Sequence, residues 1–332
     1  PCIYTGDLFP PEFYGDNFVC DPANNLIHRE RLVPNGSLFR AVRAYADREF
    51  LASTDNWFRP VFLTVGPEGA LYVLDFYREV IETPLSLPDD IKQQLNLESR
   101  GRGRIWRITP KGYQVSPLPD LTQLTPEQLA QELAHANPWR RMTAQRLFFE
   151  NPTPHLAPRL RQLLLQTRGR PARVNIAWTL QGWGALRPED ILLLLEDPLA
   201  GVREHGLRLA ETLLPQHTSL VQACQRLKND TDPMVRLQLA FTAGYLPPST
   251  AVEVLEHLLT RQDSDSWLVT AALSSSRGLE IPLLQKLIAH PSPPLVLCQR
   301  LAALIGARGN SGEIATIISL IAKERRSDTL QH

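Results

Sequence analysis

A motif that recurs about every thirty residues constrains the C-terminal two-thirds of the chain more than any other feature does. Its copies read NPWRRMTAQRL, RPARVNIAWTL, DPLAGVREHGL and DPMVRLQLAFTAGYL, and each carries an arginine: Arg141, Arg173, Arg203 and Arg236. These arginines lie 32, 30 and 33 residues apart, and the apolar residues around them follow helical spacing. Paired helices at this interval predict an α-solenoid, in which each repeat packs on its neighbours.

The helical part is typical of HEAT repeats. Asp-Pro precedes Val-Arg at 197–203 and, in a shorter form, at 232–236, so that proline opens a helix and arginine lies along its inner edge. A fifth copy contains Val269, and a degenerate sixth lies near 293–309. We expect the repeated arginines to pair with acidic neighbours or to bind backbone carbonyls between repeats.

The first part of the chain contains short apolar runs of the kind found in β-strands. Pro60–Val65 and Ala70–Phe76 flank the turn sequence Gly-Pro-Glu-Gly, which predicts a β-hairpin. Further strands are expected at Asn17–Asp21, Leu26–Leu32, Leu38–Tyr45, Gly103–Thr109 and Gly112–Ser116.

Two stretches of this β-rich part resemble each other. GDNFVCD at 15–21 matches GALYVLD at 69–75, and NLIHR at 25–29 matches GRIWR at 103–107. A repeat of about 50 residues built from short strands is typical of β-propeller blades. Because propellers need roughly four to eight blades, we expect further blades upstream of this chain.

The predicted fold class is therefore a multidomain β plus α protein. Residues 1–118 are expected to form about two blades of a partial β-propeller, and residues 119–325 an all-α HEAT-like solenoid of about five to six repeats. The polar tail at 326–332 is expected to be frayed.

Composition excludes several classes of protein. The 35 basic and 35 acidic residues balance, so nothing indicates nucleic acid or an anionic membrane as a partner. The sequence has no apolar run long enough for a transmembrane segment, and its scattered histidines show no metal-binding spacing. Cys2 and Cys20 could form a disulfide in an oxidising compartment or remain small buried thiols, and the sequence leaves both open.

The ends of the predicted hairpin collect charged and aromatic residues. Asp55, Trp57 and Arg59 precede its first strand, and a long polar excursion at 76–102 follows its second. Arginine forks bind carboxylates and phosphates in a bidentate manner, so an acidic ligand is expected here. The residues predicted to bind it are Arg59, Tyr77, Arg78, Arg100, Arg102, Asp55, Trp57 and Asp75.

A structural role for the same residues remains open. Arg59 and Arg78 could pair with nearby carboxylates and lock the loops, the candidates being Asp55, Asp75, Glu79 and Glu82. Asp75 recurs as Asp21 in the other copy, which favours loop capping over catalysis. Trp57 and Tyr77 could stack on a flat ligand or pack between blades.

Three stretches resemble one family of proteins. They are YTGDLFPPEFYGDNFVCDPANNLIHR at 4–29, STDNWFRPVFLTVGPEGALYVLDFYREVIETP at 53–84 and GRGRIWRI at 101–108. Together they resemble the large membrane-bound dehydrogenase family of planctomycetes and verrucomicrobia, in which a glucose/sorbosone dehydrogenase-like propeller is followed by HEAT repeats. The resemblance covers about the first 110 residues. The chain departs from the family at Glu68, where aspartate is common, and at Thr83, where histidine is common.

The resemblance implies an extracytoplasmic protein of the periplasm or cell envelope. Characterised relatives bind pyrroloquinoline quinone and calcium, largely through blades that this chain lacks. A haem c motif, CxxCH, is not encoded in this chain. The implied partners are a sugar-like small molecule and an electron-acceptor protein or cytochrome c domain docked on the solenoid.

Two functions follow as alternatives. The chain is expected to be the C-terminal part of a quinone-dependent sugar or alcohol dehydrogenase, inactive as this fragment alone. Its catalytic residues are then unknown, because the base that assists hydride removal is expected in the upstream blades. Alternatively, the chain is a non-catalytic propeller with HEAT repeats that binds a glycan or a protein partner.

Overall fold

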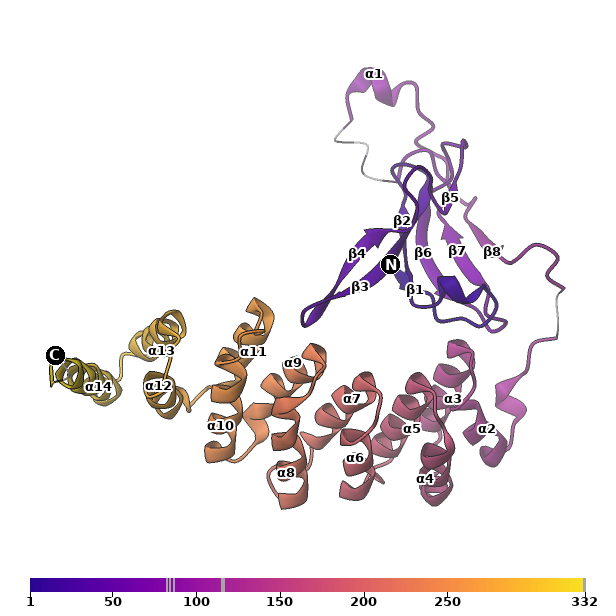
Figure 1. The fold of residues 1–332 in the computed structure, drawn as a ribbon. Coiled ribbons are helices and arrows are strands. Elements are labelled where there is room, and N and C mark those ends of the chain that lie inside the picture. The colour runs from indigo at the N-terminus through magenta and orange to yellow at the C-terminus, as the bar shows by residue number, and fades with distance from the viewer. Residues whose placement is uncertain (82, 84, 86, 115–116, 331–332) are drawn as a thin grey trace. The chain divides into compact units, whose positions relative to one another are not determined.

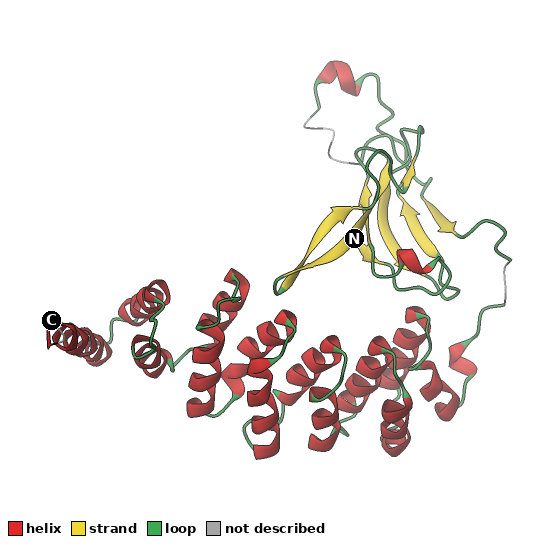
Figure 2. Ribbon diagram, in the orientation of Figure 1, coloured by secondary structure: helices red, strands yellow, loops and turns green. Residues whose placement is uncertain are grey.

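Strands give way to helices near residue 120 (Figures 1 and 2). The computed structural model describes residues 1–81, 83, 85, 87–114 and 117–330. Two compact units divide the chain: residues 1–35 with 39–185, and residues 36–38 with 186–332. The expected order of β structure followed by α structure is confirmed.

Antiparallel strands form the first sheet. Its order is β1 (Cys2–Ile3), β2 (Asn17–Asp21), β3 (Leu26–Asn35) and β4 (Leu38–Arg43), and β5 (Leu51–Ala52) pairs with β3. A four-residue turn joins β2 to β3, and Asp21 caps it because its carboxylate accepts hydrogen bonds from the backbone and side-chain nitrogens of Asn24. This turn is therefore closed by its own side chains.

The second sheet contains the predicted hairpin. β6 (Pro60–Val65), β7 (Leu71–Asp75) and β8 (Arg104–Ile108) are antiparallel neighbours in that order. At the hairpin turn Gly69 has a φ of +88°, which a residue with a Cβ adopts only under strain. A Cβ at Gly69 would also lie 2.9 Å from the backbone nitrogen of Leu8. Glycine is therefore required at this turn.

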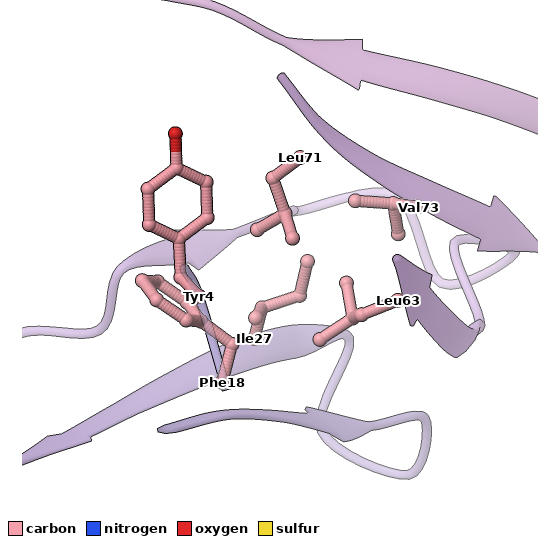
Figure 3. Close-up of a cluster of buried hydrophobic side chains, with 6 residues drawn as sticks. All are labelled: Tyr4, Phe18, Ile27, Leu63, Leu71 and Val73. Atoms are coloured by element: carbon pink, nitrogen blue, oxygen red, sulfur yellow. The ribbon is translucent and has the colours of Figure 1, made fainter. Parts of the chain in front are cut away.

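The two sheets share one apolar core, which Figure 3 shows. Tyr4, Phe18 and Ile27 from the first sheet region meet Leu63, Leu71 and Val73 from the second. The hydroxyl of Tyr4 donates a hydrogen bond of 2.6 Å to the carbonyl of Gly69, so the first segment is tied to the hairpin turn. Burial of these side chains supplies most of the attraction between the sheets.

Equivalent strands of the two sheets bury opposite faces. Phe18 of β2 is fully buried, whereas its counterpart in the repeat, Tyr72 of β7, is half-buried. Val73 is buried, whereas its counterpart Val19 is half-buried. On the outer face of the second sheet Phe62 and Ile105 are 56% and 68% exposed. The buried face of β2 is therefore the one that carries Phe18, whereas the buried face of β7 is the opposite one in the repeat, which carries Val73.

Helices of the first unit follow the sheets. They are α1 (Asp89–Lys92), α2 (Pro126–Glu132), α3 (Pro138–Glu150), α4 (Ala157–Gln166) and α5 (Arg170–Gly182). The short 3₁₀ helices whose residues are all described are η1 (Pro11–Phe13), η3 (Leu121–Gln123), η4 (Pro154–Leu156), η5 (Leu227–Asn229) and η6 (Ala243–Tyr245).

Asn137 caps α3 and also contacts the β part of the same unit. Its Oδ1 accepts from the backbone nitrogen of Trp139, as an N-cap residue does. Its Nδ2 donates to Asp7 and to the carbonyl of Pro67 in the hairpin turn. Asn137 is 1% exposed, so this buried amide is satisfied on both sides.

The second unit contains a succession of antiparallel helix pairs (Figure 1). Helix α9 packs between α7 and α11, and α6 packs against both α7 and α8. The helices are α6 (Pro188–Leu195), α7 (Ala200–Ala210), α8 (Thr218–Arg226), α9 (Pro233–Thr242), α10 (Pro248–Leu259), α11 (Ser266–Ser275), α12 (Glu280–Ile288), α13 (Leu295–Ala307) and α14 (Ser311–Leu330).

The repeated arginines bind the loop that precedes their own helix. Nη1 of Arg203 donates to the carbonyls of Asp197 and Pro198, and its remaining guanidinium nitrogens bind Asp230. Arg236 binds the carbonyls of residues 230 and 231 in the same way and reaches Asp263. Arg141 and Arg173 also donate to carbonyls of their preceding loops. The predicted structural role of these arginines is confirmed.

One predicted strand differs from the structure, and the frayed tail stays a prediction. Helix α14 (Ser311–Leu330) includes residues 326–330 of that tail. Of the strand expected at Gly112–Ser116, residues 112–114 form no strand, and 115–116 lie outside the described residues.

Candidate functional site

Asp75 is a buried carboxylate at the end of β7. It is 2% exposed and accepts three hydrogen bonds from N–H groups. Its Oδ1 accepts from the backbone nitrogens of Arg59 (2.8 Å) and Tyr77 (2.9 Å), and its Oδ2 accepts from Nε1 of Trp106 (3.0 Å). Asp75 thus caps the loop and holds β6 and β8 beside it, as its counterpart Asp21 suggested.

Arg59 is occupied by backbone carbonyls. Its guanidinium donates to the carbonyls of Arg78 and Glu79 on one side and of Pro22 and Ala23 on the other. The loop-locking role considered for this arginine is therefore realised through carbonyl oxygens, since none of its described partners is a carboxylate. Arg59 joins the β2–β3 turn to the chain that leaves β7. The alternative acid Glu82 lies outside the described residues.

Asp55 and Tyr77 join the two ends of the hairpin. The Tyr77 hydroxyl donates to Oδ2 of Asp55 at 3.0 Å, and Oδ1 of Asp55 accepts from the backbone nitrogen of Trp57. Tyr77 has a φ of +46°, a conformation that costs free energy for a bulky residue. The Asp75 carboxylate holds this conformation because it binds the Tyr77 backbone nitrogen. The aromatic ring is thereby directed over the hairpin end.

Stacked arginines and aromatic rings continue from this point. The guanidinium carbon of Arg104 lies 3.4 Å from the ring centroid of Tyr77 and 5.7 Å from that of Trp106. That of Arg102 lies 5.4 Å from the Trp57 ring, whose centroid is 5.7 Å from the Tyr77 centroid. We call these five residues the Arg–aromatic ladder. Each cation–π contact of this exposed kind contributes about 0.5–1 kcal/mol.

The two arginines of the ladder lack acidic partners among the residues that the structure describes. Arg102 and Arg104 are both exposed, and neither guanidinium forms an ion pair or a hydrogen bond within that part of the chain. A guanidinium that stacks on a ring keeps the N–H groups at its edge available. The ladder therefore presents two cationic edges beside three aromatic rings.

The remaining predicted site residues lie near the same loop but are not brought together. Arg78 stacks on Phe76 at 4.7 Å, and Arg100 is exposed. Glu79 fixes the excursion by accepting a hydrogen bond from the backbone nitrogen of Asn96. Of the eight predicted residues, Trp57, Tyr77 and Arg102 are in the ladder, Asp55 and Asp75 position it, and Arg59 holds the loop behind it.

Sequence reasoning missed Trp106 and gave Arg104 a minor place. Trp106 binds the buried carboxylate of Asp75 and packs beside Arg104. The internal repeat contained a signal, because Trp106 stands where His28 stands in the other copy. His28 instead binds Glu49. The two aligned strands thus differ at this position, and in the second copy the position holds Trp106 of the ladder.

Metal binding and membrane insertion find no support in the described residues. Within them, no three His, Cys, Asp or Glu side chains are grouped so that they could hold a metal ion. No helix in the described ranges is long and apolar enough to cross a bilayer. All four cysteines are free thiols, including Cys2 and Cys20. Burial raises the pKa of the Cys20 thiol to about 11.

Comparison with known proteins places the site in a defined domain. Residues 1–112 match the family model of a domain of unknown function, DUF7133. A search of curated proteins finds no match. The matched residues contain all the strands described above and the whole Arg–aromatic ladder, and they end before the first long helix.

Proposed function

We propose that the β-rich domain binds a planar ligand bearing carboxylate groups at the Arg–aromatic ladder. The observation that carries this proposal is the pair of exposed guanidinium groups of Arg102 and Arg104, stacked on rings and without acidic partners in the described chain. A carboxylate accepts two parallel hydrogen bonds from the edge of a guanidinium. An aromatic ligand could at the same time stack beside Trp57.

Pyrroloquinoline quinone fits this chemistry because it is planar and bears carboxylates. Arg102 and Arg104 would hold its carboxylates, and Trp57 and Tyr77 would lie against its ring system. Among the described residues no three His, Cys, Asp or Glu side chains are grouped for a metal ion. The proposal therefore places only the quinone at the ladder and leaves calcium, which the resemblance also implies, to the blades expected upstream.

The packing of the two sheets supports membership of a β-propeller. In a propeller the front of each blade packs on the back of the next, so equivalent strands bury opposite faces. Phe18 and Val73 show this arrangement, and the exposed Phe62 and Ile105 would face another blade. We propose that residues 1–118 are blades of a glucose/sorbosone dehydrogenase-like propeller and that the helices form HEAT repeats.

In this proposal the propeller belongs to a quinone-dependent sugar or alcohol dehydrogenase of the cell envelope. The catalytic base would lie outside the ladder, whose residues hold and orient the ligand. The helical repeats would serve as a scaffold or as the docking arm for an electron-acceptor protein or a cytochrome c domain. Support for this activity comes from the family resemblance and from the fit of the ladder to an acidic quinone.

Calorimetric titration of the 332-residue chain tests the ligand proposal directly. The probes are pyrroloquinoline quinone, benzene-1,3,5-tricarboxylate as a planar acid without quinone chemistry, and the neutral triamide of that acid. We expect both acids to bind and the triamide not to bind. Arg104→Gln should weaken the affinity about tenfold or more, because it removes a charge-assisted hydrogen bond.

Arg40→Gln is the matched control, since Arg40 is an exposed arginine of β4 outside the ladder. Equal affinity for acid and triamide, or equal loss with Arg104→Gln and Arg40→Gln, would refute the proposed site. For the dehydrogenase activity, a polypeptide extended upstream is incubated with quinone, calcium and aldose substrates. Absence of dye reduction there would refute the enzymatic assignment while leaving the binding site intact.

A non-catalytic interaction protein is the second candidate. One observation favours it: the second unit contains a cavity walled by exposed aromatic rings, at a distance in sequence from the ladder. Aromatic residues at a surface cavity are typical of binding sites.

A further inference from the structure

The second unit contains a cavity of about 580 Å³ on the face formed by α7, α9 and α11. Phe241 and Tyr245, which line it, are 47% and 52% exposed. The other lining residues are small or polar: Arg208, Glu211, Gln238, Gly244, Ser274, Ser275 and Arg277. A volume of this size lies within the range of sites for small ligands or short peptide segments.

Small side chains create this cavity. A Cβ at Gly244 would lie 3.7 Å from the side chain of Ser275, which is an ordinary contact, so this position has room for a Cβ. The corresponding junction of α3 and α5 in the first unit is filled, because Phe149 lies against Gly182 and leaves no room for a Cβ. The chain thus fills one helix junction with its own aromatic side chain and leaves another open.

The charged side chains that line the cavity differ in whether they have hydrogen-bond or ion-pair partners among the described residues. Arg208 binds Glu204 and the side-chain oxygen of Gln238. Glu211 accepts hydrogen bonds at Oε1 from Thr242 and Gln238. Arg277 is exposed and, among the residues described, has no ion-pair or hydrogen-bond partner. One cationic group therefore remains available beside two aromatic walls.

We infer that this cavity binds a short extended peptide segment of a partner protein, with an acidic side chain on Arg277 and apolar side chains against Phe241 and Tyr245. Ser274 and Glu211 line the same cavity, so that the Ser274 hydroxyl can donate or accept, and the Glu211 carboxylate can accept, hydrogen bonds of the peptide backbone. Glu211, which lines the cavity, disfavours a polyanion such as nucleic acid, because its carboxylate would repel the phosphates. A single carboxylate beside apolar groups matches the available charge.

A peptide array probed with the full 332-residue chain tests the inference. The array carries random twelve-residue peptides, each paired with a version in which Asn and Gln replace Asp and Glu. We expect binding to acidic peptides with neighbouring apolar residues and loss of binding to their amide versions. Gly244→Leu should abolish binding by filling the cavity, and Arg277→Glu should reduce affinity about tenfold or more.

Matched controls separate the cavity from general effects. Arg300→Glu makes the same charge change at another exposed arginine, and Gly306→Leu makes the same enlargement at a helical glycine with open space around it. Both should bind peptide like the wild type. Absence of any acidic peptide binding, binding insensitive to Gly244→Leu, or selective binding of oligogalacturonate would each overturn the inference. Arg104→Gln of the ladder should leave peptide binding unchanged, so the two proposals fail independently.

Discussion

Replacement of Asp75 by asparagine should selectively weaken the sheet that carries the Arg–aromatic ladder. Asparagine has nearly the same shape, and its oxygen can still accept from the backbone nitrogens of Arg59 and Tyr77. Its amide nitrogen would then face Nε1 of Trp106, so two donors would meet where a donor and an acceptor met before. Loss of one hydrogen bond to a charged group lowers the free energy of unfolding by about 1.5–3 kcal/mol.

A double-mutant cycle with Trp106→Phe isolates this contact. In the Trp106→Phe background the introduced amide no longer faces an indole N–H, so Asp75→Asn should cost about 1–2 kcal/mol less than in the wild type. The opening free energy of β7 and β8 is measured from amide hydrogen exchange of their peptides at increasing urea concentration. This local readout avoids treating a chain of two units as a single two-state system.

Asp21→Asn is the matched control, because Asp21 occupies the same place in the repeat but caps an exposed turn. It should change the opening free energy of its own sheet by less than about 1 kcal/mol. The reasoning would be refuted by an Asp75→Asn variant within about 0.5 kcal/mol of the wild type. An equal cost of Asp75→Asn with and without Trp106 would also refute it.

Three further outcomes are expected. Tyr4→Phe removes the hydrogen bond to Gly69 and should lower the free energy of unfolding of the β domain by about 1–2 kcal/mol in urea titrations. The hydrogen bond with His28 lowers the pKa of Glu49, so the stability that this carboxylate contributes is present above the ordinary carboxyl pKa and is lost as the pH falls through the lowered pKa. Glu49→Gln should therefore destabilise the protein at about pH 7 and have a progressively smaller effect as the pH falls, as urea titrations at several pH values will show. Burial raises the pKa of Cys224 to about 12, so Cys224 should resist iodoacetamide in the native protein and react in the denatured protein, as mass spectrometry of the peptide that contains it will show.

Local patterns predicted the central hairpin and the repeated helices. The Gly-Pro-Glu-Gly turn between two apolar runs predicted β6 and β7, and Pro60–Val65 has the predicted bounds. The spacing of Arg203 and Arg236 predicted helices whose arginines bind loop carbonyls. Both predictions depend on interactions within a few residues of chain, where turn chemistry and periodicity act directly.

Properties that depend on packing could not be predicted in the same way. Phe18 and Tyr72 occupy equivalent places in the repeat, yet only the first is fully buried, because the neighbouring sheet decides which face is covered. The partners of Arg59 are carbonyl oxygens, which every residue possesses, so no sequence pattern identifies them. The ladder likewise requires Arg104 to lie over Tyr77 from a strand far along the chain.

The arginine contacts in the second unit also limit how such a chain can change in length. Arg203 binds Asp230 and Arg236 binds Asp263, and in each pair the two residues are separated by 27 positions. An insertion or deletion between the members of a pair would leave a guanidinium or a carboxylate without its counterpart. Removal or duplication of one complete helical repeat would instead place each of these arginines beside an equivalent aspartate. The helical part can therefore gain or lose length in complete repeats far more readily than in single residues.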